Sequence, residues 1–303
     1  MWPVNCRLYW MTEAIFKLKD GRNLGYAIYG STDGEPVLYF HGTPSSRLEP
    51  LLLTNYNKDP DQLANHYSLC LIAIDRPGIG NSTFDANGSF TSFSHDVNEL
   101  MAHIKISKCK VLCWSGGGTY VLSIAYHFPQ LIEQVYIITG FSRSFKEERV
   151  FKNMNGNIYY FWSAKNIPWV MRGIMNFVAK KEAHRPIPKW LSQLPDVDHD
   201  LLNQKAAINQ VAKVTLSEAC RFGSRGIVHE AASYFKETGY VLNQIVQPVH
   251  FWWGTKDNTV TRIHAEAVER QVPDSIMHYK ENEGHLSIYV NYFEEVLETI
   301  AKK

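Results

Sequence analysis

Residues 110–127 read KVLCWSGGGTYVLSIAYH, an apolar run that breaks at Ser115 and continues as an amphipathic helical pattern. A chain that turns from strand to helix within one or two residues strains the backbone of the turning residue, so its neighbours must be small. Gly116, Gly117 and Gly118 meet that requirement. The pattern therefore predicts a strand that ends at Ser115 and a helix that follows directly.

Ser115 is a candidate nucleophile because of where this turn places it. At the carboxyl end of a strand and the amino end of a helix, free backbone N–H groups can stabilise an oxyanion. The usual nucleophile elbow is Gly-x-Ser-x-Gly, whereas this chain has Cys113 at the first glycine position. Cysteine is small enough to substitute there. On this segment alone, an ordinary serine in a glycine-rich turn explains the pattern equally well.

A serine nucleophile needs a base and a group that orients the base, and residues of both kinds occur near the C-terminus. Residues 247–254 read QPVHFWWG, a buried strand pattern, and Asp257 lies in the loop after it. A helical pattern and a short strand over 275–279 precede His285. Ser115, Asp257 and His285 thus all follow predicted parallel strands, which is where open α/β sheets place their sites.

With these residues in place, the chain resembles the α/β-hydrolases over nearly its whole length. The resemblance rests on four segments, each at the end of a predicted strand: HGTP at 41–44, DRPGIGNS at 75–82, the turn at Ser115, and GTKDNTV at 254–260 followed by Gly284-His285. The chain order Ser, Asp, His is the order of that class. The resemblance implies that Ser115, Asp257 and His285 form a catalytic triad.

The resemblance also implies an oxyanion hole. Its two backbone N–H groups are those of Thr43, the residue after His-Gly, and Gly116, the residue after the nucleophile. Some members of the family carry the acid after the strand that precedes the lid, but residues 135–142 contain no carboxylate, which favours Asp257. Epoxide hydrolases and haloalkane dehalogenases use an aspartate nucleophile, so Ser115 argues against both.

A serine with a histidine base is suited to acyl transfer through an acyl-enzyme that water then cleaves. The expected function is therefore hydrolysis of a small ester, thioester or amide, with a small-molecule acyl substrate and no cofactor or metal. A carbon–carbon bond hydrolase stays open. So does a ligand-binding or signalling module that retains the hydrolase fold, because fold alone does not determine function.

The order of patterns along the chain predicts an α/β fold with a mostly parallel, doubly wound sheet. Residues 13–19 and 23–29 flank Asp20-Gly21 and predict an N-terminal antiparallel hairpin. Strand and helix patterns then alternate to about residue 140, as in a parallel sheet with helices on both faces.

Residues 141–235 interrupt this alternation. They contain no strong strand pattern and many aromatic residues, which indicates a helical lid inserted into a core made of residues 1–140 and 236–303. Most of these aromatics are expected to pack within the lid. Others, with Trp162 and Phe145 as candidates, would line an apolar substrate pocket.

Composition and charge narrow the possible partners. The 303 residues include 31 Lys and Arg against 30 Asp and Glu, without a basic cluster that would suggest nucleic-acid binding. Five cysteines show no metal or disulfide spacing, so a cytoplasmic location is expected. No apolar run approaches the roughly 20 residues that span a membrane. The first ten residues do not read as a signal peptide, and Met11 is an alternative start to Met1.

Overall fold

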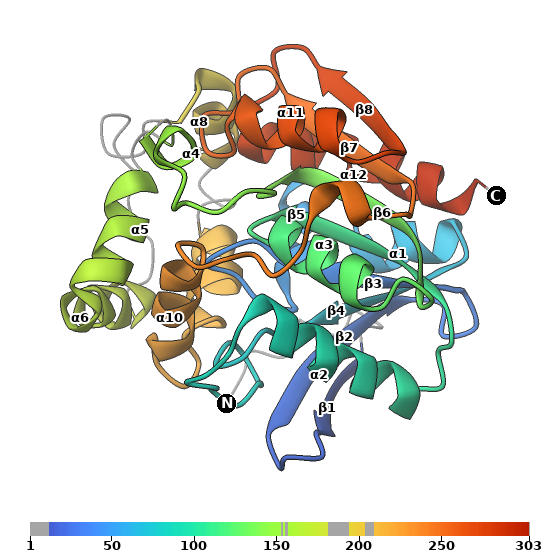
Figure 1. The fold of residues 1–303 in the computed structure, drawn as a ribbon, viewed down its shortest axis with the longest axis horizontal. Coiled ribbons are helices and arrows are strands. Elements are labelled where there is room, and N and C mark those ends of the chain that lie inside the picture. Colours follow the sequence, from blue (N-terminus) through green and yellow to red (C-terminus); the bar gives the residue numbers. More distant parts are fainter. Residues whose placement is uncertain (1–11, 153, 155–156, 181–193, 204–208, 303) are drawn as a thin grey trace.

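The computed structural model of the chain describes residues 12–152, 154, 157–180, 194–203 and 209–302 (Figure 1). The two alternative starts, Met1 and Met11, lie outside the described residues. Within the described part, the chain forms one eight-stranded sheet with helices on both faces. The predicted α/β class with a doubly wound sheet is confirmed.

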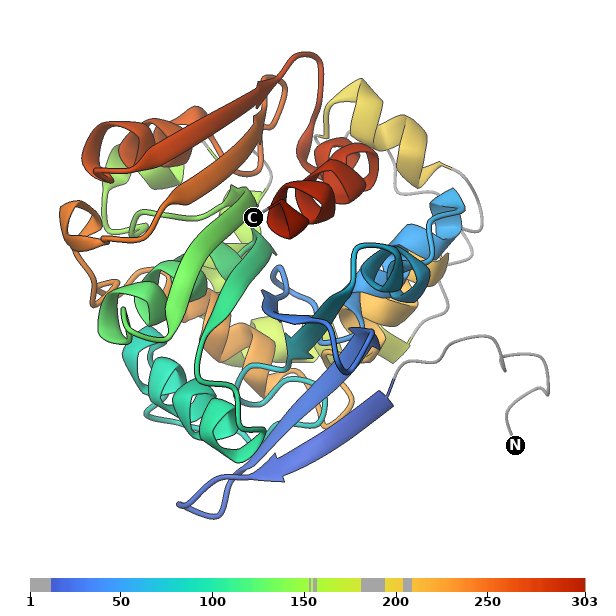
Figure 2. The ribbon, with the colours of Figure 1, turned by 90° about the vertical axis from the view of Figure 1, so that its right-hand side faces the viewer.

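The strands of the sheet follow the order β1-β2-β4-β3-β5-β6-β7-β8. Their bounds are β1 Thr12–Lys17, β2 Asn23–Gly30, β3 Glu35–Phe40, β4 Leu69–Ile74, β5 Cys109–Ser115, β6 Ile132–Gly140, β7 Val249–Gly254 and β8 Ser275–Lys280. β2 pairs antiparallel with both β1 and β4, and every pair from β4 to β8 is parallel. The N-terminal hairpin is therefore confirmed, and Figure 2 shows it at the opposite end of the sheet from β8.

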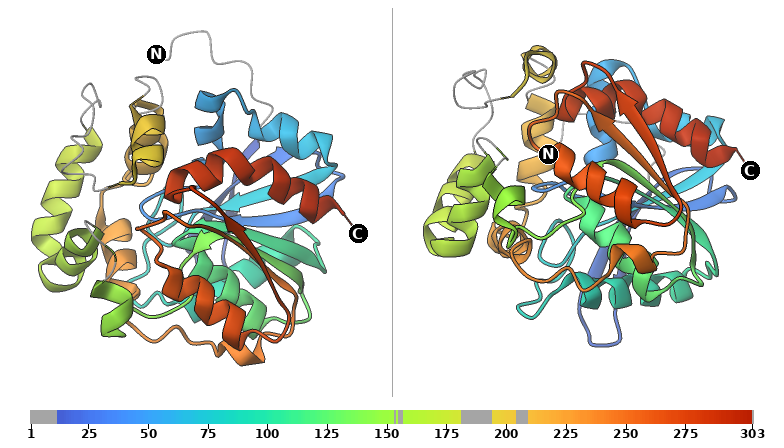
Figure 3. Two further views of the ribbon diagram at one scale, coloured as in Figure 1. Left: turned by 90° about the horizontal axis from the view of Figure 1, so that it is seen from above. Right: turned by 45° about the horizontal axis from the view of Figure 1, so that its top comes forward.

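Alternating side chains of the central strands supply a separate hydrophobic core on each face of the sheet. Val111 and Cys113 of β5 face one core, whereas Leu112 and Trp114 face the other. The helices α2 Phe90–His103, α3 Gly117–His127 and α11 Arg262–Gln271 cover the first face, and α1 Pro60–His66 and α12 His285–Ala301 cover the second (Figures 1 and 3). Burial on both faces explains the uninterrupted apolar runs in the sequence.

Helices occupy the chain between β6 and β7, and we call residues 141–235 the helical insertion. Its described helices are α4 Glu148–Lys152, α5 Asn157–Asn166, α6 Pro168–Lys180, α8 Asp196–Leu202, η2 Ala212–Ser217 and α10 Arg225–Ser233. The helices α5, α6 and α10 pack on one another beside the sheet, while α8 lies against α12 (Figure 1). No described residue between Gly140 and Val249 belongs to a strand. The division into core and lid at residue 141 stays a prediction.

Candidate active site

Ser115 lies at a tight turn between β5 and α3. Its backbone φ is 55°, in the left-handed region that non-glycine residues rarely adopt, and its side chain is buried. A Cβ at Gly117 would lie 2.2 Å from the carbonyl oxygen of Phe40, and one at Gly118 would lie 2.5 Å from that of Phe141. The two glycines are therefore required for the close approach of α3 to the ends of β3 and β6.

Three side chains from separate parts of the chain form a hydrogen-bonded chain at the carboxyl edge of the sheet. The Oγ of Ser115 lies 2.9 Å from Nε2 of His285. The Nδ1 of His285 lies 2.8 Å from Oδ2 of Asp257. Ser115 ends β5, Asp257 follows β7, and His285 begins α12. The structure thus brings together all three residues that the sequence analysis singled out.

Asp257 is held in place by hydrogen bonds on both carboxylate oxygens. Its Oδ1 accepts the backbone N–H groups of Thr259 at 2.8 Å and Val260 at 2.9 Å. The hydroxyl of Thr139 donates to Oδ2, the oxygen that also faces His285. These contacts leave the carboxylate one orientation, with Oδ2 directed at the imidazole.

The electrostatic surroundings of His285 favour its protonated form. Burial alone would disfavour the imidazolium, but the charge and hydrogen bond of Asp257, together with the charges of Asp198 and Glu49, raise the pKa of His285 above its ordinary value of 6.5. An imidazole with these neighbours can take a proton from Ser115 and hold it.

Trp114, which the sequence analysis did not single out, supports His285 from the other side. The two rings stack with their centroids 5.1 Å apart, and the indole N–H of Trp114 donates to the carbonyl oxygen of His285 at 3.2 Å. Trp114 also stacks on Tyr289 of α12, the helix that begins with His285, with ring centroids 4.5 Å apart. In the sequence, only its position directly before Ser115 indicated that Trp114 would lie near the site.

Hydrogen bonds to backbone carbonyls orient the two predicted oxyanion donors. The carbonyl oxygen of Ser115 accepts the N–H of Phe141 at 3.0 Å. Because a trans peptide unit is planar, with its C=O and N–H pointing in opposite directions, the N–H of Gly116 points away from Phe141. The Tyr234 hydroxyl donates to the carbonyl of Gly116 at 2.8 Å and anchors the next peptide unit.

The same argument applies to Thr43. The carbonyl oxygen of Gly42 accepts a guanidinium N–H of Arg76 at 2.6 Å and lies 2.8 Å from Nδ1 of His41, so the N–H of Thr43 points the opposite way. The loop is close to the serine, since a Cβ at Gly42 would lie 3.2 Å from that of Ser115. Both predicted donors are therefore held near Ser115.

A buried glutamate lies under this loop. Both carboxylate oxygens of Glu49 accept the N–H of Gly42, at 2.9 and 2.8 Å, and Oε1 also accepts the Tyr39 hydroxyl at 2.6 Å. Burial raises the pKa of Glu49 to about 7, although its hydrogen bonds act the other way. The sequence analysis missed Glu49, because no local pattern indicates that it folds back under the loop that carries Gly42 and Thr43.

A cavity of about 470 Å³ opens onto the serine. The sheet edge and its loops contribute Gly42, Thr43, Pro44, Glu49, Trp114, Ser115, Thr259 and His285, and the helical insertion contributes Asn157, Met175, Val178, Leu194, Leu202, Val211, Ala212, Thr215 and Leu216. The polar groups are thus concentrated around Ser115, and the insertion supplies a mostly aliphatic wall.

The two aromatic residues expected at the pocket, Phe145 and Trp162, are not among the residues that line this cavity. Phe145 is 2% exposed and packs edge-on against Phe141 and Phe161. Trp162 is 48% exposed. On the side of the insertion, aliphatic side chains line the described cavity instead, because Phe145 packs against other rings and Trp162 faces solvent.

Among the residues that the structure describes, no group of His, Cys, Asp or Glu is arranged to hold a metal ion. The described helices likewise include none that is long and apolar enough to cross a membrane.

Comparisons with known proteins agree with this fold. The model of the family described as alpha/beta hydrolase fold matches residues 35–292. An uncharacterized protein of Mycobacterium tuberculosis is 23% identical over 90% of this chain and 76% of its own length. An uncharacterized hydrolase of Bacillus subtilis, YcgS, is 22% identical over 88% of this chain and 89% of its own.

Among solved structures, an esterase from Exiguobacterium antarcticum superimposes with a TM-score of 0.66 at 19% sequence identity, over 96% of this chain and 99% of that one. This likeness concerns the fold. It agrees with the family match and with the arrangement of the strands. The protein belongs to the α/β-hydrolase family and is a hydrolase.

Proposed function

We propose that the protein is a serine hydrolase that cleaves an ester, thioester or amide through an acyl-enzyme. The observation that carries this proposal is the hydrogen-bonded chain from Ser115 through His285 to Asp257, which opens onto an apolar cavity. In this proposal Ser115 is the nucleophile, His285 the base and Asp257 the acid that orients it.

The first half of the reaction acylates the serine. Nε2 of His285 takes the proton of Ser115 as Oγ forms a bond to the carbonyl carbon of the substrate. The carbonyl π electrons move to oxygen, and the N–H groups of Thr43 and Gly116 stabilise the resulting oxyanion. When the intermediate collapses, the bond to the leaving group breaks, and the imidazolium of His285 gives its proton to that group.

The second half releases the acid. Water attacks the acyl carbon while His285 accepts one of its protons, and a second tetrahedral intermediate forms at the same oxyanion position. Its collapse breaks the bond to Oγ of Ser115, which recovers its proton from His285. Asp257 orients His285 and stabilises the imidazolium that forms twice in the cycle.

The cavity favours a small-molecule substrate with an apolar acyl or leaving group. Its wall on the side of the insertion is lined by side chains such as Met175, Leu202 and Leu216, which offer few hydrogen bonds. We propose that residues 141–235 act as a lid over this substrate. The four described free cysteines, Cys70, Cys109, Cys113 and Cys220, are consistent with the expected cytoplasmic location.

A fluorophosphonate probe tests the nucleophile, because an activated serine displaces its fluoride and the phosphonate oxygen takes the oxyanion position. Intact mass should show one adduct on the parent protein, mapped to Ser115, none on Ser115→Ala, and much slower labelling of His285→Ala. Labelling at another residue would contradict the assignment. An unlabelled parent would favour a ligand-binding module. If Ser115 is labelled, turnover of nitrophenyl esters and thioesters would favour acyl hydrolysis over carbon–carbon bond cleavage.

A further inference from the structure

A carboxylate from the helical insertion caps the helix that begins with His285. Asp198 of α8 is fully buried and accepts three backbone N–H groups at the start of α12, those of His285 at 2.6 Å, Leu286 at 3.1 Å and Ser287 at 2.8 Å. A helix N-terminus leaves such N–H groups unsatisfied, and the residue before it normally caps them. That residue is Gly284, which has no side chain.

Gly284 also leaves room for the cap to come from elsewhere in the chain. A Cβ at Gly284 would lie 2.5 Å from both carboxylate oxygens of Asp198. The cap of α12 is therefore supplied by a residue 87 positions earlier, from a different part of the fold.

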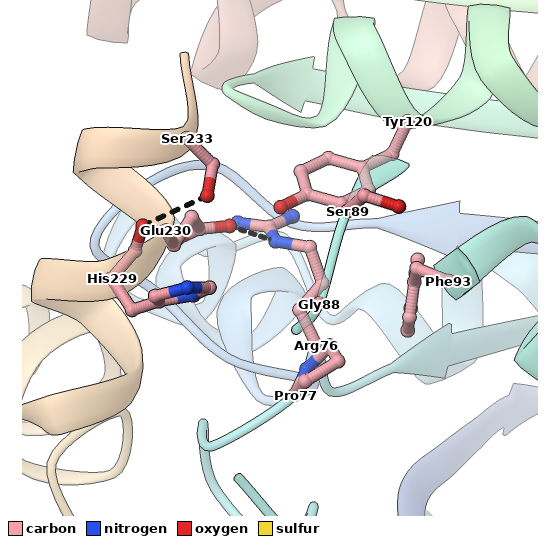
Figure 4. A pocket seen from close by; sticks show the side chains of 9 residues that line it. All are labelled: Arg76, Pro77, Gly88, Ser89, Phe93, Tyr120, His229, Glu230 and Ser233. Atoms are coloured by element: carbon pink, nitrogen blue, oxygen red, sulfur yellow. Dashed lines mark hydrogen bonds and ion pairs between the residues drawn. The ribbon is translucent and has the colours of Figure 1, made fainter. Parts of the chain in front are cut away.

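A second carboxylate of the insertion holds the loop that carries Gly42 and Thr43. Glu230 of α10 is buried, forms an ion pair with the buried guanidinium of Arg76, and accepts the Thr43 hydroxyl at 2.7 Å. Figure 4 shows Glu230 and Arg76 joined in this way beside Tyr120. The helix lies directly on the loop that carries Arg76, because a Cβ at Gly226 would lie 2.0 Å from the carbonyl oxygen of Gly78.

Glu230 thereby acts on both sides of one peptide unit. Arg76 donates to the carbonyl oxygens of His41 and Gly42, and the peptide unit that contains the Gly42 carbonyl also contains the N–H of Thr43. A buried arginine requires a counter-charge, which Glu230 provides. Because the peptide unit is rigid, fixing the Gly42 carbonyl and the Thr43 side chain also fixes the direction of the Thr43 N–H.

We propose that Asp198 and Glu230 are positioning residues through which the insertion completes the active site, Asp198 by orienting His285 and Glu230 by orienting the Thr43 oxyanion donor. This inference rests on the proposed function. It means that the insertion does more than cover the substrate: the base and the oxyanion donor reach their working geometry only while α8 and α10 are docked on the core.

The charge of Asp198 gives this proposal a measurable signature. Among the described residues, the charged groups that face His285 are Asp257 from the loop after β7, Asp198 from α8 and Glu49 from the 3-10 helix η1, Glu49–Tyr56. All three favour the imidazolium. Replacing Asp198 by a neutral residue removes one of them and leaves the positive end of the helix dipole uncompensated. Both changes lower the pKa of His285.

The Asp198 experiment compares Asp198→Asn with Asp198→Ala. Asparagine still accepts N–H hydrogen bonds, so Asp198→Asn should keep most of the kcat while the acid limb of its pH profile moves to lower pH. Asp198→Ala removes the cap and should lower kcat about 100-fold, as small displacements of catalytic groups do. KM should change little in either variant. If Asp198→Ala does not fold, the pH profile of Asp198→Asn tests the role of Asp198 alone.

The Glu230 experiment uses a trifluoromethyl ketone, which adds to Ser115 and forms a tetrahedral oxyanion. Glu230→Gln should lower kcat at least about tenfold and weaken binding of the ketone by the same factor, with KM unchanged, because only the oxyanion interaction is lost. Thr43→Val removes the hydroxyl but leaves the Arg76 ion pair intact, so it tests the same link if Glu230→Gln does not fold. Thr43→Ser keeps a hydroxyl that can donate to Glu230 and should therefore bind the ketone more tightly than Thr43→Val.

Glu218 provides the matched control. It also joins the insertion to a buried core arginine, Arg47, at 2.7 Å, but it is not among the residues that line the cavity. Glu218→Gln should change thermal stability without changing the pH profile or the affinity for the ketone.

Two results would overturn the proposal. One is an Asp198→Asn variant with the parent's pH profile, and the other is folded Glu230→Gln and Thr43→Val variants with the parent's ketone affinity. Either would make the corresponding carboxylate a structural anchor only. A parent that fluorophosphonate does not label would instead contradict the proposed function. NMR titration of the His285 imidazole in the parent and in Asp198→Asn then still measures the Asp198 effect without requiring activity.

Discussion

The sheet edge and the helical insertion meet at one cavity and contribute different chemistry to it. The edge supplies polar groups at fixed distances, with Ser115, His285 and Asp257 joined by hydrogen bonds of 2.9 and 2.8 Å. The insertion supplies mostly aliphatic surface, represented by Met175 and Leu202. On the proposed function, we expect the edge to carry out the reaction and the aliphatic wall to select which acyl or leaving group fits.

The difference has a physical cause. The carboxyl ends of neighbouring parallel strands lie at the same edge, so the loops after them bring residues that are distant in the chain within hydrogen-bonding distance. Helices packed over that edge contribute whichever side chains face inward, and apolar ones are stabilised by burial. Changes at the edge should thus alter kcat, and changes in the wall should alter substrate preference.

The largest expected effect is at the edge. Asp257→Asn should lower kcat by about 10⁴-fold, because the amide no longer holds the correct tautomer of His285 or stabilises its charge. Circular dichroism should show an unchanged fold. Asp274→Asn, at an exposed position before β8, is the matched control and should keep kcat within about twofold. Near-normal turnover of Asp257→Asn would mean that another group serves as the acid.

A substitution in the wall should change substrate preference instead. Ala212 lines the cavity from η2, and Ala212→Phe should shorten it. The ratio of kcat/KM for octanoyl over acetyl nitrophenyl esters should fall more than about tenfold, since a few methylene groups are worth that much in an apolar pocket. Met175→Leu, which conserves volume, should leave the ratio near that of the parent. Equal losses on both esters would contradict the division between edge and wall.

The pH profile should depend on the edge and not on the wall. The pKa of His285 is raised above 6.5, and the residue must be neutral to accept the proton of Ser115. Activity should therefore rise with pH, with a midpoint above about 6.5, and fall about tenfold for each pH unit below that midpoint. Ala212→Phe should keep the same midpoint. A midpoint at the ordinary histidine value or below would contradict the stabilisation of the imidazolium.

The smallest expected effect concerns the turn beneath Ser115. Cys113 is fully buried, and a Cβ at Gly117 would already lie 2.8 Å from that of Cys113. Cys113→Leu should lower the free energy of unfolding by about 1–3 kcal/mol through overpacking, as measured by urea denaturation. Cys113→Gly should keep activity within about tenfold. A leucine variant as stable and active as the parent would show that the turn is not crowded.

Local patterns predicted much of the sheet because each depends on a few neighbouring residues. The strand expected before residues 75–82 forms β4, Leu69–Ile74, and the expected hairpin forms β1 and β2. The strand expected over 247–254 begins later, at Val249. Gln247 lies before the strand, where its side-chain amide donates to the carbonyl oxygens of Ala125 and Pro129, a contact that no local pattern contains.

In the candidate site too, local patterns predicted some residues, whereas the position of others depends on how the helices pack. Ser115, Asp257 and His285 follow strands that apolar runs and glycines mark locally, so the sequence predicted that they would meet, and their catalytic roles stay predictions. Whether a ring of the insertion faces the cavity depends on how its helices pack. Apolar periodicity does not encode that packing. Neither Phe145 nor Trp162 is among the residues that line the described cavity, and their place in a substrate pocket stays a prediction.

The sequence by itself therefore determined the fold class, the family and the strand ends at which the polar groups gather, because strand periodicity and sharp glycine turns are local properties. Only the tertiary structure decided that Asp198 caps the helix of His285, that Glu230 holds the loop that carries Thr43, and that Glu49 lies beneath that loop. These contacts join residues that have no pattern in common. A buried carboxylate acquires its role from the N–H groups and charges that folding brings around it.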